Sequence, residues 1–251
     1  MIQIEGVTAL VTGGNRGIGR AFVEELIAQG ANRVYAAARN PDDVDAELRE
    51  LGAVPVRLDV TDPEQVREAA WNCADVSLLI NNAGLFAGQR LIKAEDPDAA
   101  RAEMEVNYFG VLAMTREFAP VLAANGGGAI ANVLSVAGMV PAPFMGGYSP
   151  SKAAALWLST ITRAELEPQG TSVTALIVGS VDTRMASHVD GRKEDPRDIA
   201  RAGLKAVKRG EHVADTDWMA IDARARVARD PSGYERQMAR MLHVPTLRTG
   251  R

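Results

Sequence analysis

Residues 12–19 read TGGNRGIG and separate two different patterns in the sequence. Upstream, residues 7–11 (VTALV) form a mostly apolar run typical of a buried strand, and downstream a helical pattern extends from residue 17 to about residue 29. A glycine-rich turn at such a junction lets backbone N–H groups approach a pyrophosphate, and the helix N-terminus adds partial positive charge. The stretch therefore predicts a dinucleotide site at the start of a βαβ fold.

The glycines of this turn have an unusual spacing. Gly13, Gly17 and Gly19 follow G-x-x-x-G-x-G, which differs from the common dinucleotide fingerprint G-x-G-x-x-G. The turn by itself therefore leaves open that these residues form only a tight connection between a strand and a helix. If it binds a dinucleotide, its candidate contacts are Gly13, Asn15, Arg16, Gly17, Ile18 and Gly19.

The alternation of strand and helix patterns continues along the chain. Further β-rich runs, mostly apolar on consecutive positions as in parallel strands covered on both faces, lie at residues 33–38, 54–58, 76–80, 129–135 and 172–178. Longer helical patterns lie between them, including one at about residues 98–124. We therefore predict an α/β fold with one doubly wound, Rossmann-like parallel sheet in a single domain over residues 1–251.

Composition excludes several function classes. The 251 residues carry a formal net charge of −4 and no clustered basic face, so we expect no nucleic-acid partner. Cys73 is the only cysteine and the histidines His188, His212 and His243 lack metal-ligand spacing, so no metal site is predicted. No apolar run approaches the roughly 20 residues of a membrane helix. We expect no membrane contact and a cytoplasmic protein.

The stretch GGYSPSK, residues 146–152, places a phenol and an ammonium one helical turn apart. A free tyrosine has a pKa of about 10, and a nearby cation lowers it, so Lys152 can prepare Tyr148 for proton transfer near neutral pH. Ser135, at the end of a predicted strand, can hold a carbonyl oxygen beside the phenol. Without further motifs, Tyr148 and Lys152 would more simply be neighbours on a helix surface.

Further motifs follow in an ordered set: NNAG at residues 81–84 after the fourth strand, Asn107, Ser135, and Y-x-x-x-K at Tyr148 and Lys152. With TGGNRGIG, this set resembles the short-chain dehydrogenase/reductase family over about residues 5–185. The resemblance implies that Lys152 also grips the nicotinamide ribose and that Asn107 holds a water in a proton relay. The alternatives are that Ser135 simply ends a strand and that Asn107 makes helix hydrogen bonds.

The resemblance also implies cofactor contacts outside the glycine-rich turn. These are Arg39, Asp59, Val60, Asn82, Ala83, Gly84, Tyr148, Lys152, Gly179, Val181 and Thr183. For Asp59 and Val60, a turn that starts a helix is a competing interpretation.

The chain departs from the family pattern toward its end. Val178 stands where the family often has proline, which predicts a changed loop entry with retained cofactor binding. The apolar strand and Asp-Gly-Gly of many relatives are missing, so we expect no regular seventh strand and a helical segment over about residues 197–245. Residues of about 184–200 occupy the place of a mobile substrate lid.

Cofactor choice is predicted from the end of the second strand. An acidic residue there would repel a 2′-phosphate, whereas this strand ends in Arg39, and Arg16 lies in the glycine-rich turn. The two guanidinium groups favour NADP(H) over NAD(H). The alternative is that Arg39 is solvated and Arg16 only caps the turn.

The motifs together predict an NADPH-dependent carbonyl reductase or alcohol dehydrogenase. The main alternative is a non-catalytic dinucleotide-sensing or scaffold protein on the same fold; epimerisation or dehydration would need an additional acid or base. We expect a small, apolar carbonyl or alcohol substrate and a homo-oligomer, dimer or tetramer. Loop residues that line the substrate pocket, unless they belong to the core, are Leu85, Phe86, Met139, Phe144, Met145 and Met185.

Overall fold

A computed structural model describes residues 2–187 and 189–243 of the chain. Its centre is one seven-stranded sheet with the order β3-β2-β1-β4-β5-β6-β7, in which every neighbouring pair is parallel. The strands are β1 (Thr8–Thr12), β2 (Arg33–Ala38), β3 (Ala53–Arg57), β4 (Leu78–Asn81), β5 (Gly128–Val133), β6 (Thr171–Ile177) and β7 (Val213–Asp215). The order reverses between β1 and β4, and parallel sheets place their ligand crevice at such a point.

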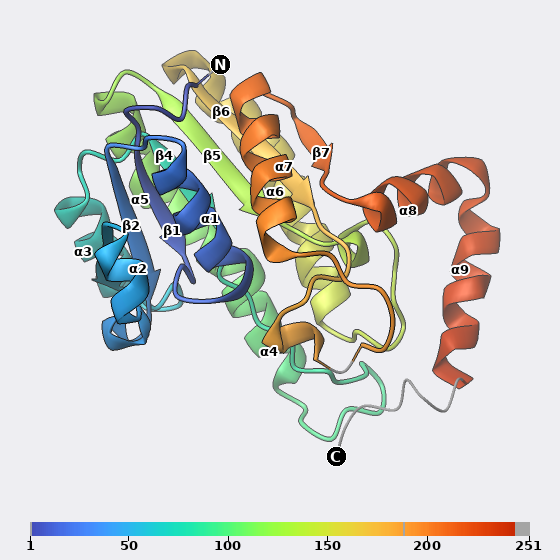
Figure 1. Cartoon of the computed structure of the whole chain (residues 1–251). Coiled ribbons are helices and arrows are strands. Elements are labelled where there is room, and N and C mark those ends of the chain that lie inside the picture. The colour runs from blue at the N-terminus through green and yellow to red at the C-terminus, as the bar shows by residue number, and fades with distance from the viewer. Residues whose placement is uncertain (1, 188, 244–251) are drawn as a thin grey trace.

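Helices cover both faces of the sheet (Figure 1). They are α1 (Gly17–Ala28), α2 (Ala46–Glu50), α3 (Pro63–Asn72), α4 (Ala99–Met104), α5 (Val111–Ala124), α6 (Tyr148–Leu166), α7 (Pro196–Arg209), α8 (Trp218–Arg229) and α9 (Pro231–Arg240). Among the described residues, no helix is long and apolar enough to cross a membrane.

Strand alternation divides the buried side chains between two main cores. Leu78 and Ile80 of β4 pack in the core under α1 and α7, whereas Leu79 packs in the core under α3 and α5. Phe22 of α1 and Phe118 of α5 are fully buried centres of these two cores. Because both faces are covered, consecutive apolar residues are buried in the central strands β1, β4, β5 and β6, whereas Val54 of the edge strand β3 is exposed.

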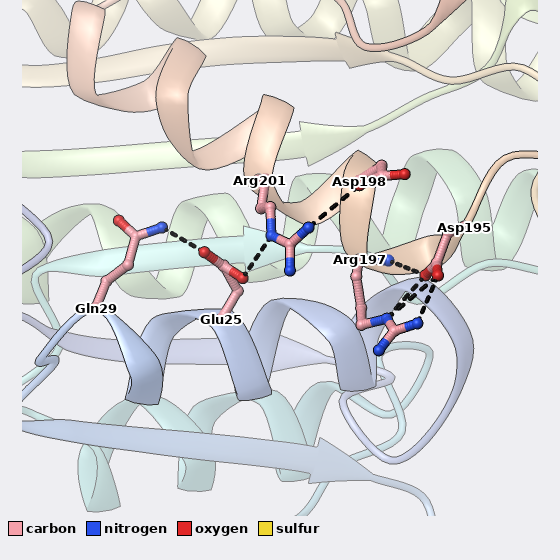
Figure 2. A network of polar contacts seen from close by, with 6 residues as sticks. All are labelled: Glu25, Gln29, Asp195, Arg197, Asp198 and Arg201. Atoms are coloured by element: carbon pink, nitrogen blue, oxygen red, sulfur yellow. Dashed lines mark hydrogen bonds and ion pairs between the residues drawn. The ribbon is translucent and has the colours of Figure 1, made fainter.

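An ion pair joins helices α1 and α7, which cover the same face of the sheet (Figure 2). Arg201 of α7 lies 3.3 Å from Glu25 of α1 through its Nε, and Gln29 donates a hydrogen bond to the same carboxylate. Arg201 also contacts Asp198, one turn earlier on α7. The contacts fix α7, whose first turn belongs to the predicted lid segment, against the helix of the glycine-rich turn.

The expected absence of a seventh strand is wrong. Residues Val213–Asp215 form β7, which pairs in parallel with Ala175–Ile177 of β6. The strand has three residues and only Ala214 is buried, so it is too short to produce an apolar run in the sequence. The helical end is confirmed within the described residues: α8 and α9 extend beyond β7 at one end of the sheet (Figure 1).

The helix predicted at about residues 98–124 is divided into three parts. A π-helical turn, Glu105–Gly110, separates α4 from α5. Gly110 leaves no room for a side chain, because a Cβ there would lie 2.7 Å from Val60. Such turns are frequent at functional sites, and this one carries Asn107.

Candidate active site

The glycine-rich turn opens toward the loop after β6. Gly13 and Gly17 have positive φ angles of 63° and 55°, which favour glycine, and a Cβ on Gly17 would lie 3.2 Å from the Thr183 methyl group. Arg16 precedes α1 without capping it through its side chain, so no side-chain cap uses the first N–H groups of the helix. The backbone here fits a bound phosphate group: a helix N-terminus faced by a close loop.

Asn82 holds the glycine-rich turn in place. Its Nδ2 donates to the carbonyl oxygens of Thr12 and Gly13, at 2.9 and 3.3 Å. The Thr12 hydroxyl in turn accepts hydrogen bonds from the backbone N–H groups of Asn82 and Ala83. The ends of β1 and β4 are therefore locked together, and the predicted cofactor residue Asn82 positions the turn with its side chain.

The two glycines before Tyr148 are required by close packing. A Cβ on Gly146 would lie 2.2 Å from the Gln89 carbonyl oxygen, and one on Gly147 would lie 2.4 Å from the Cα of Ala100. The loop after β4 and helix α4 therefore press directly against the start of α6. Because Tyr148 is the first residue of α6, these contacts determine where its phenol lies.

Lys152 is buried beside Tyr148 on the same face of α6. Its Nζ lies 5.7 Å from the centre of the Tyr148 ring and donates a hydrogen bond to the carbonyl oxygen of Val133, 3.0 Å away at the end of β5. Burial lowers the pKa of Lys152 to about 8. The hydrogen bond to Val133 therefore holds the ammonium in place, although burial removes most of its hydration.

Burial also dominates the acidity of Tyr148 and raises its pKa to about 12. A side-chain hydrogen bond with Ser135 acts in the opposite direction, and the negative charge of Glu103 adds to the rise. We expected Lys152 to lower this pKa; in the chain without cofactor, burial sets the direction of the shift, and the effect of Lys152 on the phenol stays a prediction. Ser135 is nevertheless where the sequence placed it, at the start of the short 3-10 turn Val136–Gly138 beside the phenol.

Asn107 is completely buried in the π-helical turn and uses its side-chain amide for protein contacts. Its Oδ1 accepts from the backbone N–H of Leu85, and its Nδ2 donates to the Leu85 carbonyl oxygen and to the Ser151 hydroxyl. A Cβ added to Gly84 would lie 3.3 Å from Asn107 Oδ1 and 3.7 Å from Lys152 Nζ, so this glycine lies between the two polar groups. Asn107 thus fixes the loop after β4; its predicted water relay stays a prediction.

Comparison with known proteins agrees with this geometry. The family model described as short chain dehydrogenase matches residues 7–194. The chain belongs to the short-chain dehydrogenase/reductase family. Membership makes it an oxidoreductase with a fold that binds a nicotinamide dinucleotide.

Individual relatives resemble the chain to different extents. A short chain dehydrogenase from Burkholderia cenocepacia, solved in complex with NADP, is 42% identical, covers 94% of this chain and 99% of its own, and has a TM-score of 0.90. The sorbitol dehydrogenase of Cereibacter sphaeroides is 33% identical over 81% of this chain and 82% of its own length. An uncharacterised oxidoreductase of Schizosaccharomyces pombe is 34% identical over 72% of this chain, which spans only 62% of that relative.

Other predicted cofactor residues of this short-chain dehydrogenase make structural contacts. Asp59 accepts hydrogen bonds from the backbone and hydroxyl of Thr61, as expected for a turn that starts a helix. Val60 is buried against Gly110. Gly179 donates its N–H to Asp217 at 2.7 Å, and Val181 packs in the core and forms a bridge with Glu194. Gly179 and Val181 lie in the loop after β6, and Asp59 and Val60 lie after β3. Cofactor contact stays a prediction for each.

Arg16, in the glycine-rich turn, and Arg39, directly after β2, are both exposed. Within the described ranges, neither guanidinium has an ion pair or hydrogen bond. Two carboxylates of the segment after β2 are engaged by another cation: Arg20 of α1 contacts Asp45 and Glu47. The site therefore presents two uncommitted cations, one in the glycine-rich turn and one after β2.

The six candidate pocket residues divide into different environments. Phe86 packs edge-on against Tyr148, with ring centres 5.2 Å apart, and Met185 is exposed after Thr183. Met139 packs partly against the small core formed around Leu134 and Ala155. Leu85, Phe144 and Met145 are half-buried in the loops on either side of Tyr148.

Sequence reasoning missed a cavity of about 210 Å³ beside the start of α6. Its walls are Gln89, Arg90, Leu91, Ile92, Ala94, Asp96, Pro97, Ala100 and Gly147, and none of the six candidate pocket residues is among them. It also missed Glu103, a buried carboxylate next to the cavity wall. In the stretch RAEMEVN, Glu103 has the pattern of a solvent-facing helix charge, so the sequence carries no signal for its burial.

The predicted lid is partly ordered by its own contacts. Lys193 pairs with Asp182 at 3.4 Å, and the backbone of Glu194 bonds with those of Ser180 and Asp182. Residues from Pro196 onward already belong to α7. Closure of the remaining segment over a substrate stays a prediction, and His188 lies outside the described residues.

Proposed function

We propose that this short-chain dehydrogenase is an NADPH-dependent oxidoreductase that interconverts a carbonyl compound and a secondary alcohol, with Tyr148 as the general acid and base. The observation that carries the proposal is the convergence of Ser135, Tyr148 and Lys152 at the end of β5, beside a glycine-rich turn suited to a dinucleotide. A protein that only senses a dinucleotide has no physical need for a half-buried phenol beside a buried ammonium.

Ser135 and Tyr148 have different roles at the substrate oxygen: Ser135 binds it and Tyr148 protonates it. The Ser135 hydroxyl donates a hydrogen bond to the carbonyl oxygen and holds it beside the phenol. When bound, NADPH supplies the hydride that forms the new C–H bond, and the oxidised form accepts it in the reverse direction. As the C=O double bond opens, Tyr148 gives its proton to the oxygen, and the phenolate takes a proton back from solvent.

Lys152 supports the ionised form of Tyr148. With a pKa of about 8, its amine is largely protonated at neutral pH. The hydrogen bond to Val133 keeps the ammonium near the tyrosine ring, where a positive charge stabilises the phenolate that proton transfer creates. Lys152 would also hold the nicotinamide ribose, and the helix N-terminus at Gly17 the pyrophosphate.

The preference for NADP(H) is supported by the charges around β2. Arg39 and Arg16 are exposed and uncommitted within the described chain, while Asp45 and Glu47 are paired with Arg20. A 2′-phosphate would therefore meet two cations and partly neutralised carboxylates. The NADP in the related Burkholderia cenocepacia structure favours the same choice.

The substrate side of the site favours an apolar compound. Phe86 packs edge-on against Tyr148, and the half-buried Leu85, Phe144 and Met145 lie in the loop after β4 and in the loop before α6. Flexible thioethers and aromatic rings suit an apolar ketone or alcohol whose oxygen is held by Ser135.

A cofactor-oxidation screen tests the proposed function. Aliphatic, aromatic, steroid-like and polyketide ketones are each offered with NADPH and with NADH. We expect turnover of at least one apolar ketone, with higher kcat/KM for NADPH. Tight binding of NADPH without turnover of any ketone or alcohol would instead favour the dinucleotide-sensing alternative.

A further inference from the structure

Glu103 differs from the other buried carboxylate among the described residues. Asp217 accepts hydrogen bonds from the backbone N–H groups of Gly179, Met219 and Ala220, so both of its oxygens are engaged. Glu103 is 1% exposed, and its Oε1 accepts one hydrogen bond, from the N–H of Ala87 at 2.8 Å. Its Oε2 is buried without a hydrogen-bond partner. An incompletely satisfied buried carboxylate is costly and calls for a functional explanation.

The unpartnered oxygen is directed at the start of the catalytic helix. A Cβ on Gly147 would lie 2.7 Å from Glu103 Oε2, so the glycine makes room for the carboxylate. Desolvation raises the pKa of Glu103, and the N–H groups of Ala87, Gly147 and Tyr148 oppose that rise. The carboxylate therefore lies where the partial positive charge of the 19-residue helix α6 favours an anion.

We propose that Glu103 is a positioning residue whose carboxylate joins the loop at Ala87 to the start of α6 and opposes the ionisation of Tyr148. The inference rests on the proposed role of Tyr148 as acid and base. Through Ala87, the carboxylate also fixes the loop that carries Phe86 against the tyrosine ring.

The groups around Tyr148 show in which direction Glu103 changes the ionisation of the phenol. Lys152 faces it from α6, Ser135 from the end of β5, Glu103 from α4, and the apolar Phe86 from the loop after β4. Of these groups only Glu103 can carry a negative charge, which makes phenolate formation less favourable.

Charged groups around Glu103 itself are few. Arg90 lines the cavity that Gly147 and Ala100 share and makes no ion pair with Glu103 in the described structure, and Asp96 in the same lining is another carboxylate. The Arg90 guanidinium instead donates to the carbonyl oxygen of Leu242. The charge of Glu103 is therefore not cancelled by a paired cation within the described residues.

Two variants remove the charge in different ways. Glu103→Gln keeps an oxygen that can accept from Ala87, whereas Glu103→Met removes the charge and the hydrogen bond with little change in volume. Glu105→Gln is the matched control, because Glu105 lies exposed in the adjacent π-helical turn. Folding is checked by thermal unfolding and by the dissociation constant for NADPH.

The first measurement is the pH dependence of kcat for oxidation of the best secondary alcohol. Oxidation requires ionised Tyr148, so kcat rises with pH through the ionisation of the phenol. Removing a negative neighbour makes ionisation easier, so both Glu103 variants should move this rise to lower pH by roughly 0.5–1 unit, and Glu105→Gln should not.

The second measurement separates the loop contact from the charge. Amide hydrogen exchange in residues 85–90 should be faster in Glu103→Met and nearly unchanged in Glu103→Gln. A pH profile that stays in place in both variants, or that moves equally in Glu105→Gln, overturns the charge role. Unchanged exchange in Glu103→Met overturns the positioning role.

Tyr148→Phe distinguishes failure of this inference from failure of the proposed function. If that variant loses most of its turnover while the Glu103 profiles stay in place, only the role of Glu103 is refuted. If Tyr148→Phe keeps more than about half of wild-type turnover, the proposed function itself falls.

Discussion

Lys152 and Val133 are joined by a hydrogen bond of 3.0 Å from the buried ammonium to the last carbonyl of β5. The contact fixes the cation beside Tyr148, but a single carbonyl replaces only part of the water that an ammonium binds. The lowered pKa of Lys152, about 8, expresses this loss. The active site therefore holds a group that reduces the stability of the cofactor-free protein.

Replacing Lys152 with Met should stabilise the cofactor-free protein at pH 7 while lowering its activity. The pKa of Lys152 changes from 10.5 when unfolded to about 8 when folded, so the unfolded state binds more protons between these values. The wild-type free energy of unfolding should consequently rise with pH across this window. At pH 7 the full penalty, up to about 3 kcal/mol before loss of the Val133 hydrogen bond, is relieved in Lys152→Met.

Denaturant unfolding of both proteins at pH 7 and near pH 10.5 measures this difference. The stability advantage of Lys152→Met should shrink as the pH rises. Lys205→Met is the control, because Lys205 is exposed on α7 and should show no such pH-dependent difference. An advantage that is constant from pH 7 to 10.5 would contradict the assignment.

Tyr148→Phe should leave the fold and cofactor binding largely intact and reduce turnover by about 10²–10⁴-fold. Only the phenolic oxygen is lost, and the ring can still pack against Phe86. Steady-state kinetics and an NADPH titration measure the two effects. Tyr234→Phe, on α9 at the far end of the chain, is the matched control and should retain full turnover.

Local patterns in the sequence were sufficient to predict the order of the elements and that Ser135, Tyr148 and Lys152 lie together. Tyr148 and Lys152 share a helix face because they are four residues apart, and Ser135 follows a recognisable strand. The βαβ order was readable because both faces of the sheet are buried, which makes most strands continuously apolar.

Features that depend on contacts between distant segments could not be predicted. The strand β7 is recognised only by its pairing with β6, and the burial of Glu103 arises from the approach of Ala87 and Gly147. The raised pKa of Tyr148 has the same origin. A neighbouring Lys152 is visible in the sequence, whereas the desolvation that raises the pKa of the phenol is a property of the folded chain.

Helix α6 should form a subunit interface through Trp157 and Ile161. These side chains are 70% and 56% exposed and lie four residues apart, on the same face of the helix. We propose that a second copy of the chain covers them, since clustered exposed apolar side chains mark interaction surfaces.

Trp157→Glu should therefore reduce the mass measured by light scattering at micromolar concentration. Trp71→Glu is the matched control, because Trp71 is exposed on α3, away from α6. A wild-type protein that is already monomeric at this concentration would refute the interface.

Arg39→Asp should change the preference of the enzyme from NADP(H) toward NAD(H). Arg39 follows β2, where a dinucleotide fold places the adenosine ribose, and its guanidinium is uncommitted within the described chain. A hydrogen bond between charged groups contributes about 1.5–3 kcal/mol, which corresponds to roughly 10- to 150-fold in affinity, less where solvent screens the site.

The aspartate would both remove this contact and repel the 2′-phosphate, while it could accept hydrogen bonds from the ribose hydroxyls of NAD. We therefore expect the ratio of kcat/KM for NADPH over NADH to fall by at least about tenfold, mainly through KM for NADPH. Arg229→Asp makes the same charge change at the end of α8 and should leave the ratio unchanged. Equal use of both cofactors by the wild-type enzyme, or a ratio that Arg39→Asp does not alter, would refute the role of Arg39 in cofactor choice.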